Sequence, residues 1–129
     1  MAEATELAPR TVQDVMSTTV TTVSVNEVIG PIRDTIIFGG ISAVPVLGDS
    51  GEVLGILTAS DLVEEYAPRE SVRNAMSPAV AMVKPTTTLA DAAKQMRERH
   101  IHHLVVEHNG ELVGIVTTFD LLDALIAER

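Results

Sequence analysis

Cysteine is absent from the chain, which excludes disulfides, thiolate nucleophiles and sulfur-ligated metals. Tryptophan is absent too, and with one Tyr and two Phe the hydrophobic core has to be built from Val, Ile, Leu, Ala and Met. No apolar run approaches the ~18 residues of a membrane-spanning helix, so we expect no membrane partner. The leading segment MAEATELAPR is acidic and polar and lacks the apolar part of a signal peptide. These absences predict a cytoplasmic protein.

Positive charge is also scarce, with nine Lys and Arg against 18 Asp and Glu and a formal net charge of −9. A nucleic-acid backbone is bound by clustered Lys and Arg, so we expect no nucleic-acid partner. One basic cluster, Arg97–His103, stands out against this acidic background. A positive patch on a negative protein is a candidate anion site, although it also fits the solvated ends of a helix and a strand.

One unit is written twice along the chain. VQDVMSTTVTTV (Val12–Val23) matches VRNAMSPAVAMV (Val72–Val83), and GEVLGILTASDL (Gly51–Leu62) matches GELVGIVTTFDL (Gly110–Leu121). Identical residues fall at Met16/Met76, Ser17/Ser77, Gly55/Gly114, Thr58/Thr117 and Asp61/Asp120. The repetition predicts two structurally similar halves.

Each copy is predicted to run strand, helix, strand, hairpin, strand, helix. Asn109-Gly110 is the signal of a tight two-residue hairpin, and Asp49-Ser50-Gly51 is its longer counterpart. The hairpins are expected to join Ala43–Leu47 to Val53–Leu57 and Leu104–Glu107 to Leu112–Val116.

Helices are predicted on both sides of each hairpin. In the second copy Thr88 is the expected N-cap of a helix with an apolar face at Leu89, Ala92, Ala93 and Met96. In the first copy Pro31 suits the first turn of a helix, and Gly39-Gly40 suits its end. The apolar face of this helix is expected to consist of Val28, Ile32, Ile36 and Ile37. The closing helices are expected over Asp61–Tyr66 and Asp120–Ala127.

The domain organisation follows from the copies. We expect a flexible segment over 1–11, a first repeat over 12–66, a linker over 67–71 that contains Pro68, and a second repeat over 72–129. One copy leaves an apolar face uncovered, so the two should pack into one globule. The predicted fold class is α+β, with two pseudo-symmetric β-α-β-β-α repeats.

The sequence G-h-h-T-x-x-D (h, hydrophobic) closes each hairpin, at Gly55–Asp61 and Gly114–Asp120. It can be a nucleotide cradle, in which helix N–H groups attract phosphate, Thr adds a donor and Asp accepts from a ribose diol. It can equally be a variant of the capping box, in which Thr caps the helix and the acid complements its dipole. Two copies do not decide between these readings, because a duplicated helix also duplicates its cap.

The early Met-Ser, the apolar strand after I-x-x, the turn Gly and the G-h-h-T-x-x-D ending, in this order and in two copies, resemble the cystathionine-β-synthase (CBS) domain family. The resemblance extends from Val12 to about Leu125. It implies a stand-alone CBS pair that is a regulatory module and not an enzyme, with two clefts for AMP, ADP, ATP, S-adenosylmethionine or a related ligand. It further implies no required cofactor, a homodimer of CBS pairs and an effector protein reached in trans.

Matching positions can be carried over from the family. Asp61 and Asp120 would hold the ribose hydroxyls, and Thr58 and Thr117 would meet ribose or phosphate. The first cleft would consist of Thr58, Ser60, Asp61, Val80, His102 and His103. The second cleft would consist of Val20, Ser42, Ala43, Thr117, Phe119 and Asp120, with Val20 and Val80 flanking the adenines.

The two clefts are predicted to differ, because Ser42 and Ala43 in one copy match His102 and His103 in the other. We therefore expect the Asp61 cleft to bind phosphate better, and Asp61→Ala to weaken binding more than Asp120→Ala. His100 and His102 have usable metal-ligand spacing, but nothing completes a shell, so no metal site is predicted. A scaffold with vestigial clefts is the alternative function. An enzyme is disfavoured because no catalytic constellation can be written.

Overall fold

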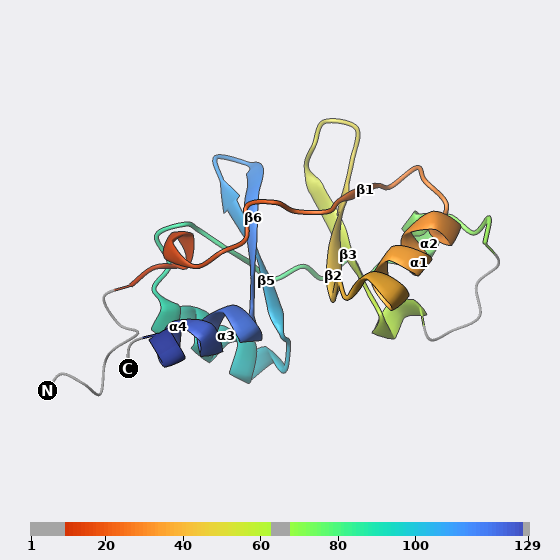
Figure 1. Cartoon of the computed structure of the whole chain (residues 1–129). Helices are drawn as coiled ribbons and strands as arrows, with labels where there is room; N and C mark the ends of the chain where they lie inside the picture. The colour runs from red at the N-terminus through yellow and green to blue at the C-terminus, as the bar shows by residue number, and fades with distance from the viewer. Residues whose placement is uncertain (1–9, 63–67, 128–129) are drawn as a thin grey trace, which may run out of the picture. The chain divides into compact units, whose positions relative to one another are not determined.

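The computed structural model describes residues 10–62 and 68–127. These residues form two three-stranded sheets, β1-β2-β3 and β4-β5-β6, with helices against them (Figure 1). The predicted α+β class is confirmed. The chain divides into two compact units, one over Val20–Val80 and the other made of the leading segment up to Thr19 together with the chain from Ala81 onward. Among the described residues, no helix combines the length and apolarity that crossing a membrane requires.

The Val20–Val80 unit is a small sheet covered by helices. Its elements are β1 (Val23–Ser24), α1 (Ile29–Gly39), β2 (Ala43–Leu47), β3 (Val53–Thr58), the 3-10 helix η3 (Ser60–Leu62) and α2 (Val72–Ala75). Strand β1 runs parallel to β2 with α1 as the crossover, and β2 pairs antiparallel with β3. Its core joins Ile29, Ile32 and Ile36 of α1 to Val44, Val46 and Leu57 of the sheet.

The second unit repeats this plan. Its elements are the 3-10 helix η2 (Val12–Asp14), β4 (Met82–Val83), α3 (Leu89–Arg99), β5 (His103–His108), β6 (Glu111–Thr117) and α4 (Thr118–Ala127). Strand β4 is parallel to β5, and β5 is antiparallel to β6. Its core joins Leu89, Ala92 and Met96 of α3 to Leu104, Val116 and Leu121.

Both predicted hairpins are confirmed. Asn109 and Gly110 have φ values of 53° and 83°, the two positive values that a tight primed turn requires. In the other hairpin Gly51 has φ 84° and donates its N–H to the carbonyl oxygen of Gly48 at 3.0 Å. Both hairpins carry a shift of register at equivalent places, between Val46 and Leu47 and between Val106 and Glu107.

The helix that was predicted from Thr88 is confirmed, since the Thr88 side chain accepts from the Asp91 N–H at 3.1 Å at the start of α3. The predicted end of α1 is confirmed as well, because Gly40 takes a left-handed conformation with φ 74°. The predicted apolar face of α1 is partly wrong. Val28 and Ile37 are 41% and 51% exposed. Val28 precedes the first turn, and Ile37 lies about 100° around the helix from Ile36, so neither shares the buried face of Ile32 and Ile36.

Other boundaries also shift. Helix α4 begins at Thr118 and not at Asp120. Of the helix expected over Asp61–Tyr66, the described part begins as η3, and residues 63–66 lie outside the described residues. The expected flexible segment lies outside them up to residue 9, as does residue 67 of the expected linker. The short helices η2 and α2 were not predicted; Ser71 starts α2 by accepting from the Arg73 N–H at 3.1 Å.

The start of each copy contacts the sheet of the other copy. Ser17 pairs with Ile115 of β6, with N···O distances of 2.9 and 3.0 Å in the two directions. Ser77 pairs in the same way with Ile56 of β3, at 2.9 Å in both directions. The compact units are therefore not identical with the sequence repeats, because each unit contains the leading segment of the opposite repeat.

Candidate functional site

The residues that are identical between the copies meet at one place in each unit. A Cβ atom on Gly114 would lie 2.6 Å from the Met16 Sδ atom and 3.0 Å from the Ser17 carbonyl oxygen. A Cβ atom on Gly55 would lie 2.5 Å from the Met76 Sδ atom and 2.9 Å from the Ser77 carbonyl oxygen. Glycine is therefore required because the Met-Ser segment lies directly against the strand that leads to the Thr and Asp of the motif.

The Thr and Asp of each motif form a reciprocal cap. Asp61 Oδ2 accepts from the Thr58 N–H at 2.9 Å and from the Thr58 hydroxyl at 3.1 Å, and the Asp61 N–H donates back to Thr58 Oγ1 at 3.4 Å. The corresponding distances between Thr117 and Asp120 are 2.8, 3.1 and 3.3 Å. The capping interpretation of the motif is thus confirmed. It occupies only one oxygen of each carboxylate and holds the other in a fixed direction.

The second carboxylate oxygen differs between the copies. Asp61 Oδ1 accepts a hydrogen bond from the Ser77 hydroxyl at 2.9 Å. The equivalent Ser17 hydroxyl turns away and donates to the Thr19 carbonyl oxygen at 3.3 Å. Among the described residues, Asp120 Oδ1 accepts no hydrogen bond. Asp120 is half-buried and therefore presents an oriented, available acceptor at the start of α4.

The sequence-predicted site residues are distributed over both units. Thr58, Ser60, Asp61, Val80, Val20, Ser42 and Ala43 belong to the Val20–Val80 unit. His102, His103, Thr117, Phe119 and Asp120 belong to the other unit. Each predicted cleft thus draws on both units, and that composition stays a prediction.

Within a unit, the contacts of these residues are defined. The strand register places His103 directly across from Thr117 and Ala43 directly across from Thr58. The His102 carbonyl oxygen accepts from the Thr118 N–H at 2.9 Å, which fixes the backbone between the histidines and the start of α4. Ala43 is buried, whereas Phe119 is 75% exposed. The histidines therefore lie beside the Thr117 motif in their own unit, and their sharing of a cleft with Asp61 stays a prediction.

Ser77 is the residue that sequence reasoning missed as an individual partner of Asp61. Its signal was present, because Ser17 and Ser77 are identical between the copies while the next residues, Thr18 and Pro78, are not. Among the described residues, no three His, Cys, Asp or Glu side chains gather as a metal-binding group.

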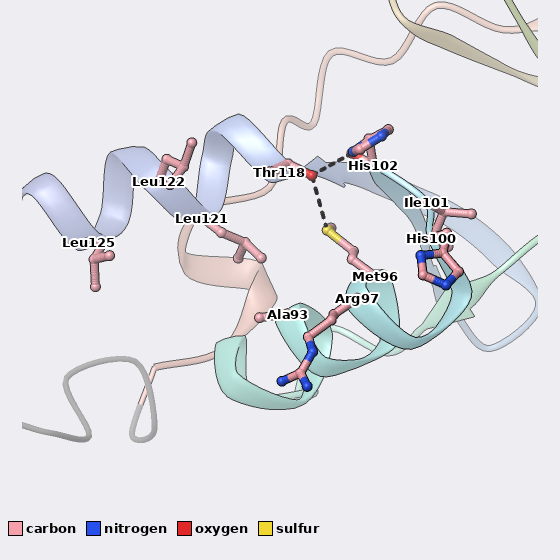
Figure 2. Close-up of a pocket in the computed structure, with 10 residues that line it drawn as sticks. All are labelled: Ala93, Met96, Arg97, His100, Ile101, His102, Thr118, Leu121, Leu122 and Leu125. Carbon is pink, nitrogen blue, oxygen red and sulfur yellow. Dashed lines mark hydrogen bonds between the residues drawn. The ribbon is translucent and has the colours of Figure 1, made fainter. Parts of the chain in front are cut away.

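A hollow of about 570 Å³ lies between α3 and α4, apart from the Thr-Asp motifs. Figure 2 shows Leu121 of α4 projecting toward Ala93 and Met96 of α3. The Thr118 hydroxyl contacts the Met96 Sδ atom at 3.6 Å and ties the two helices together at one end. The side chains that line the hollow are mainly apolar, and Arg97, His100 and His102 are its basic residues. Of the predicted site residues, only His102 belongs to it.

The family model described as "CBS domain" matches residues 12–68 and 72–127. An uncharacterized protein of Methanocaldococcus jannaschii is 31% identical, with 89% of this chain and 90% of that protein covered. The CBS domain-containing protein YhcV of Bacillus subtilis is 30% identical, with 85% of this chain and 81% of that protein covered. Other relatives are longer: the chain covers 26% of a homoserine O-acetyltransferase of Methanohalophilus mahii, to which it is 31% identical.

Solved structures match the fold over nearly the whole chain. A CBS-domain containing protein from Agrobacterium tumefaciens has a TM-score of 0.80 at 31% identity and covers 89% of this chain and 92% of its own. CBSX2 in complex with AMP has a TM-score of 0.82 at 24% identity, with 93% and 99% covered. The CBS domain of a bacterial CNNM/CorC family Mg²⁺ transporter in complex with ATP has a TM-score of 0.83 at 21% identity, with 96% and 92% covered. The last two likenesses show the fold alone.

Proposed function

The chain belongs to the CBS domain family, and from this premise we propose that it is a non-catalytic regulatory module that binds an adenine nucleotide or a related adenosyl ligand. The observation that carries the proposal is the Asp120 carboxylate. One of its oxygens is held by Thr117, and the other is an oriented acceptor with no protein partner among the described residues. A ribose hydroxyl is the natural donor for such an oxygen, since hydrogen bonds to a charged acceptor are stronger than neutral ones.

Other features of the chain support binding of the rest of a nucleotide. Helix α4 begins at Thr118, and the positive end of the helix dipole favours the negative charge of a phosphate. Half-buried Val20 and Val80 remain our proposed contacts for the adenine faces. Support also comes from the solved complexes with AMP and ATP, which have this fold.

We further propose that two copies of the chain associate through α4. Leu122, Leu125 and Ile126 are 46%, 37% and 65% exposed on this helix, beside the apolar hollow against α3. An exposed apolar helix face of this kind is typical of a protein interface. A second copy is the proposed occupant, because the family resemblance implies a dimer of pairs. Ligand occupancy would then be passed to an effector protein in trans, in the cytoplasm, by favouring one of two packings of the module.

Thermal denaturation of the full chain with AMP, ADP, ATP or S-adenosylmethionine tests the proposed function. A ligand that binds only the folded state stabilises it, by about 2.7 kcal/mol at a hundredfold excess over Kd, so at least one of the four should raise the Tm by several degrees. Asp120→Asn should reduce the shift, because the Thr117 donors keep the amide oxygen at the Oδ2 position and leave the amide nitrogen, which cannot accept from ribose, in place of Oδ1. An unchanged Tm with all four ligands would favour a scaffold whose Thr-Asp motifs only cap helices.

A further inference from the structure

The two Thr-Asp motifs offer different numbers of free acceptors. In both, Oδ2 of the acid is engaged by the Thr of the motif. Asp61 Oδ1 is also engaged, by the Ser77 hydroxyl at 2.9 Å, whereas Asp120 Oδ1 accepts no hydrogen bond among the described residues. The motifs are otherwise closely alike, because their capping distances agree within 0.1 Å for each of the three hydrogen bonds. The serine is thus the difference that bears on the carboxylate.

The two serines differ in the residue that follows them and in the hydrogen bond that their hydroxyl donates. Ser77 precedes Pro78, and the residue before a proline is restricted to extended backbone. Ser17 precedes Thr18, and its hydroxyl donates to the Thr19 carbonyl oxygen at 3.3 Å. Both serines keep their backbone pairing with the neighbouring strand, at Ile56 and Ile115. The difference between them therefore lies in the side chain, since the Ser77 hydroxyl reaches the acid and the Ser17 hydroxyl does not.

We infer that Ser77 is an internal competitor for Asp61, and that Asp120 is the carboxylate that selects a ribose diol. This inference rests on the proposed function. A nucleoside hydroxyl that approaches Asp61 must displace or share an existing charge-assisted hydrogen bond, whereas one that approaches Asp120 gains a new one. The Asp120 site should then require a ribonucleoside with its diol intact. The Asp61 site should discriminate weakly between ribonucleotides and deoxyribonucleotides.

The hydrogen bonds favour Asp120, and not Asp61, as the acid whose loss weakens ribose binding more, which differs from the ranking predicted from the sequence. The histidine pair led to the expectation that Asp61→Ala weakens binding more than Asp120→Ala. At the ribose end of the ligand the opposite order follows, because the Asp61 carboxylate already has a partner on both oxygens. A preference of His102 and His103 for phosphate is compatible with the weaker role of Asp61 at the ribose, since phosphate is the other end of the nucleotide.

Calorimetric titration with AMP and with 2′-deoxy-AMP separates the two sites when each acid is replaced in turn. Asp61→Asn leaves the Asp120 site, and we expect AMP to bind it about tenfold more tightly than 2′-deoxy-AMP, the equivalent of one hydrogen bond to a charged acceptor. Asp120→Asn leaves the Asp61 site, where the preference should be less than about threefold. Equal preferences at the two sites would overturn the inference.

The serine itself is tested by a matched pair of variants. Adding Ser77→Ala to Asp120→Asn frees Asp61 Oδ1 and should tighten AMP binding about fivefold, with a smaller gain for 2′-deoxy-AMP. Adding Ser17→Ala to Asp61→Asn removes a hydroxyl that does not touch the acid and should change the affinity less than about twofold. A Ser77→Ala variant that melts like its parent but binds AMP no more tightly overturns the inference and leaves the proposed function standing. If none of AMP, ADP, ATP and S-adenosylmethionine binds the unmodified chain, both the inference and the proposed function are overturned.

Discussion

At the scale of single residues, one close approach explains why Gly, Met and Ser recur at Gly55/Gly114, Met16/Met76 and Ser17/Ser77. Gly55 and Gly114 leave room for a methionine and for the carbonyl oxygen of the serine that follows it. The serine pairs with the next residue of the strand, Ile56 or Ile115, and the strand ends at the capping Thr. The identities that first indicated a repeated binding motif therefore have a structural role, and the available Oδ1 of Asp120 is what remains for a ligand.

Replacing Gly114 by Ala should destabilise the protein. The new Cβ would lie 2.6 Å from Met16 Sδ, which can move, and 3.0 Å from the Ser17 carbonyl oxygen, which is held by the pairing with Ile115. We expect a loss of about 1–3 kcal/mol in the free energy of unfolding, measured by urea denaturation. Gly39→Ala is the matched control, since its Cβ meets only Thr35 Cγ2 at 3.8 Å, and it should be neutral or slightly stabilising. Equal stability of Gly114→Ala and the unmodified chain would contradict the proposed close packing.

At the scale of elements, the two crossover helices begin differently. Helix α3 has a side-chain cap, Thr88, whereas Val28 at the start of α1 provides none. The first N–H groups of α1 are instead satisfied by main-chain oxygens: Ile29 donates to Glu70 at 2.9 Å and Gly30 donates to Pro68 at 3.0 Å. Pro31 has no N–H to offer. A capping side chain at position 28 would therefore find no donor, which explains why a valine is tolerated there.

Exchanging the two cap residues should have unequal consequences for stability. Thr88→Val removes the hydrogen bond from the Asp91 N–H and should lower the free energy of unfolding by about 1 kcal/mol. Val28→Thr should change it by less than about 0.5 kcal/mol, although threonine is the better cap residue in general. Urea denaturation of both variants measures the difference. A gain near 1 kcal/mol from Val28→Thr would show that the carbonyl oxygens of Pro68 and Glu70 do not replace the cap.

Local signals account for what could be predicted of the elements and the site. Asn109-Gly110 and the Thr88 cap act within a few residues, so the hairpin and α3 were found from the sequence. The capping box of Thr58 and Asp61 is local too, and it was recognised as one of two readings. The contact of Ser77 with Asp61 joins residues 16 positions apart, and no periodicity reveals it. The exposed Ile37 shows a further limit, because an apolar residue beside a buried face is not itself buried.

At the scale of the whole molecule, the chain forms two compact units, and each unit contains the leading segment of the opposite sequence repeat. Met16 and Ser17 of the first copy pack in the unit that contains β6, and Met76 and Ser77 of the second copy pack in the unit that contains β3. Each sheet is therefore joined by an isolated backbone pairing to a segment of the other repeat. The resemblance to a solved CBS-domain structure covers 89% of the chain and so extends over both copies.

The proposed association of two copies through α4 can be tested by a single charge. Leu125→Glu places a carboxylate on the exposed apolar face beside the hollow against α3, and burial of an unpaired charge in an interface is strongly unfavourable. Sedimentation velocity should show a dimer for the unmodified chain and a monomer for the variant. Glu111→Lys, at an exposed position of the β5-β6 hairpin, should stay dimeric. A Leu125→Glu variant that remains a dimer would place the interface elsewhere.

The central claim, that the chain binds an adenine nucleotide at the Asp120 motif, is tested most directly by following backbone amide resonances during a titration with AMP. The account predicts saturable shifts of the amides of Thr117 and Asp120, which take part in the hydrogen bonds that orient the carboxylate. The amide of Gly39, at the end of α1, should stay in place. Unchanged spectra at millimolar AMP, or saturable shifts that leave Thr117 and Asp120 unmoved, would contradict it.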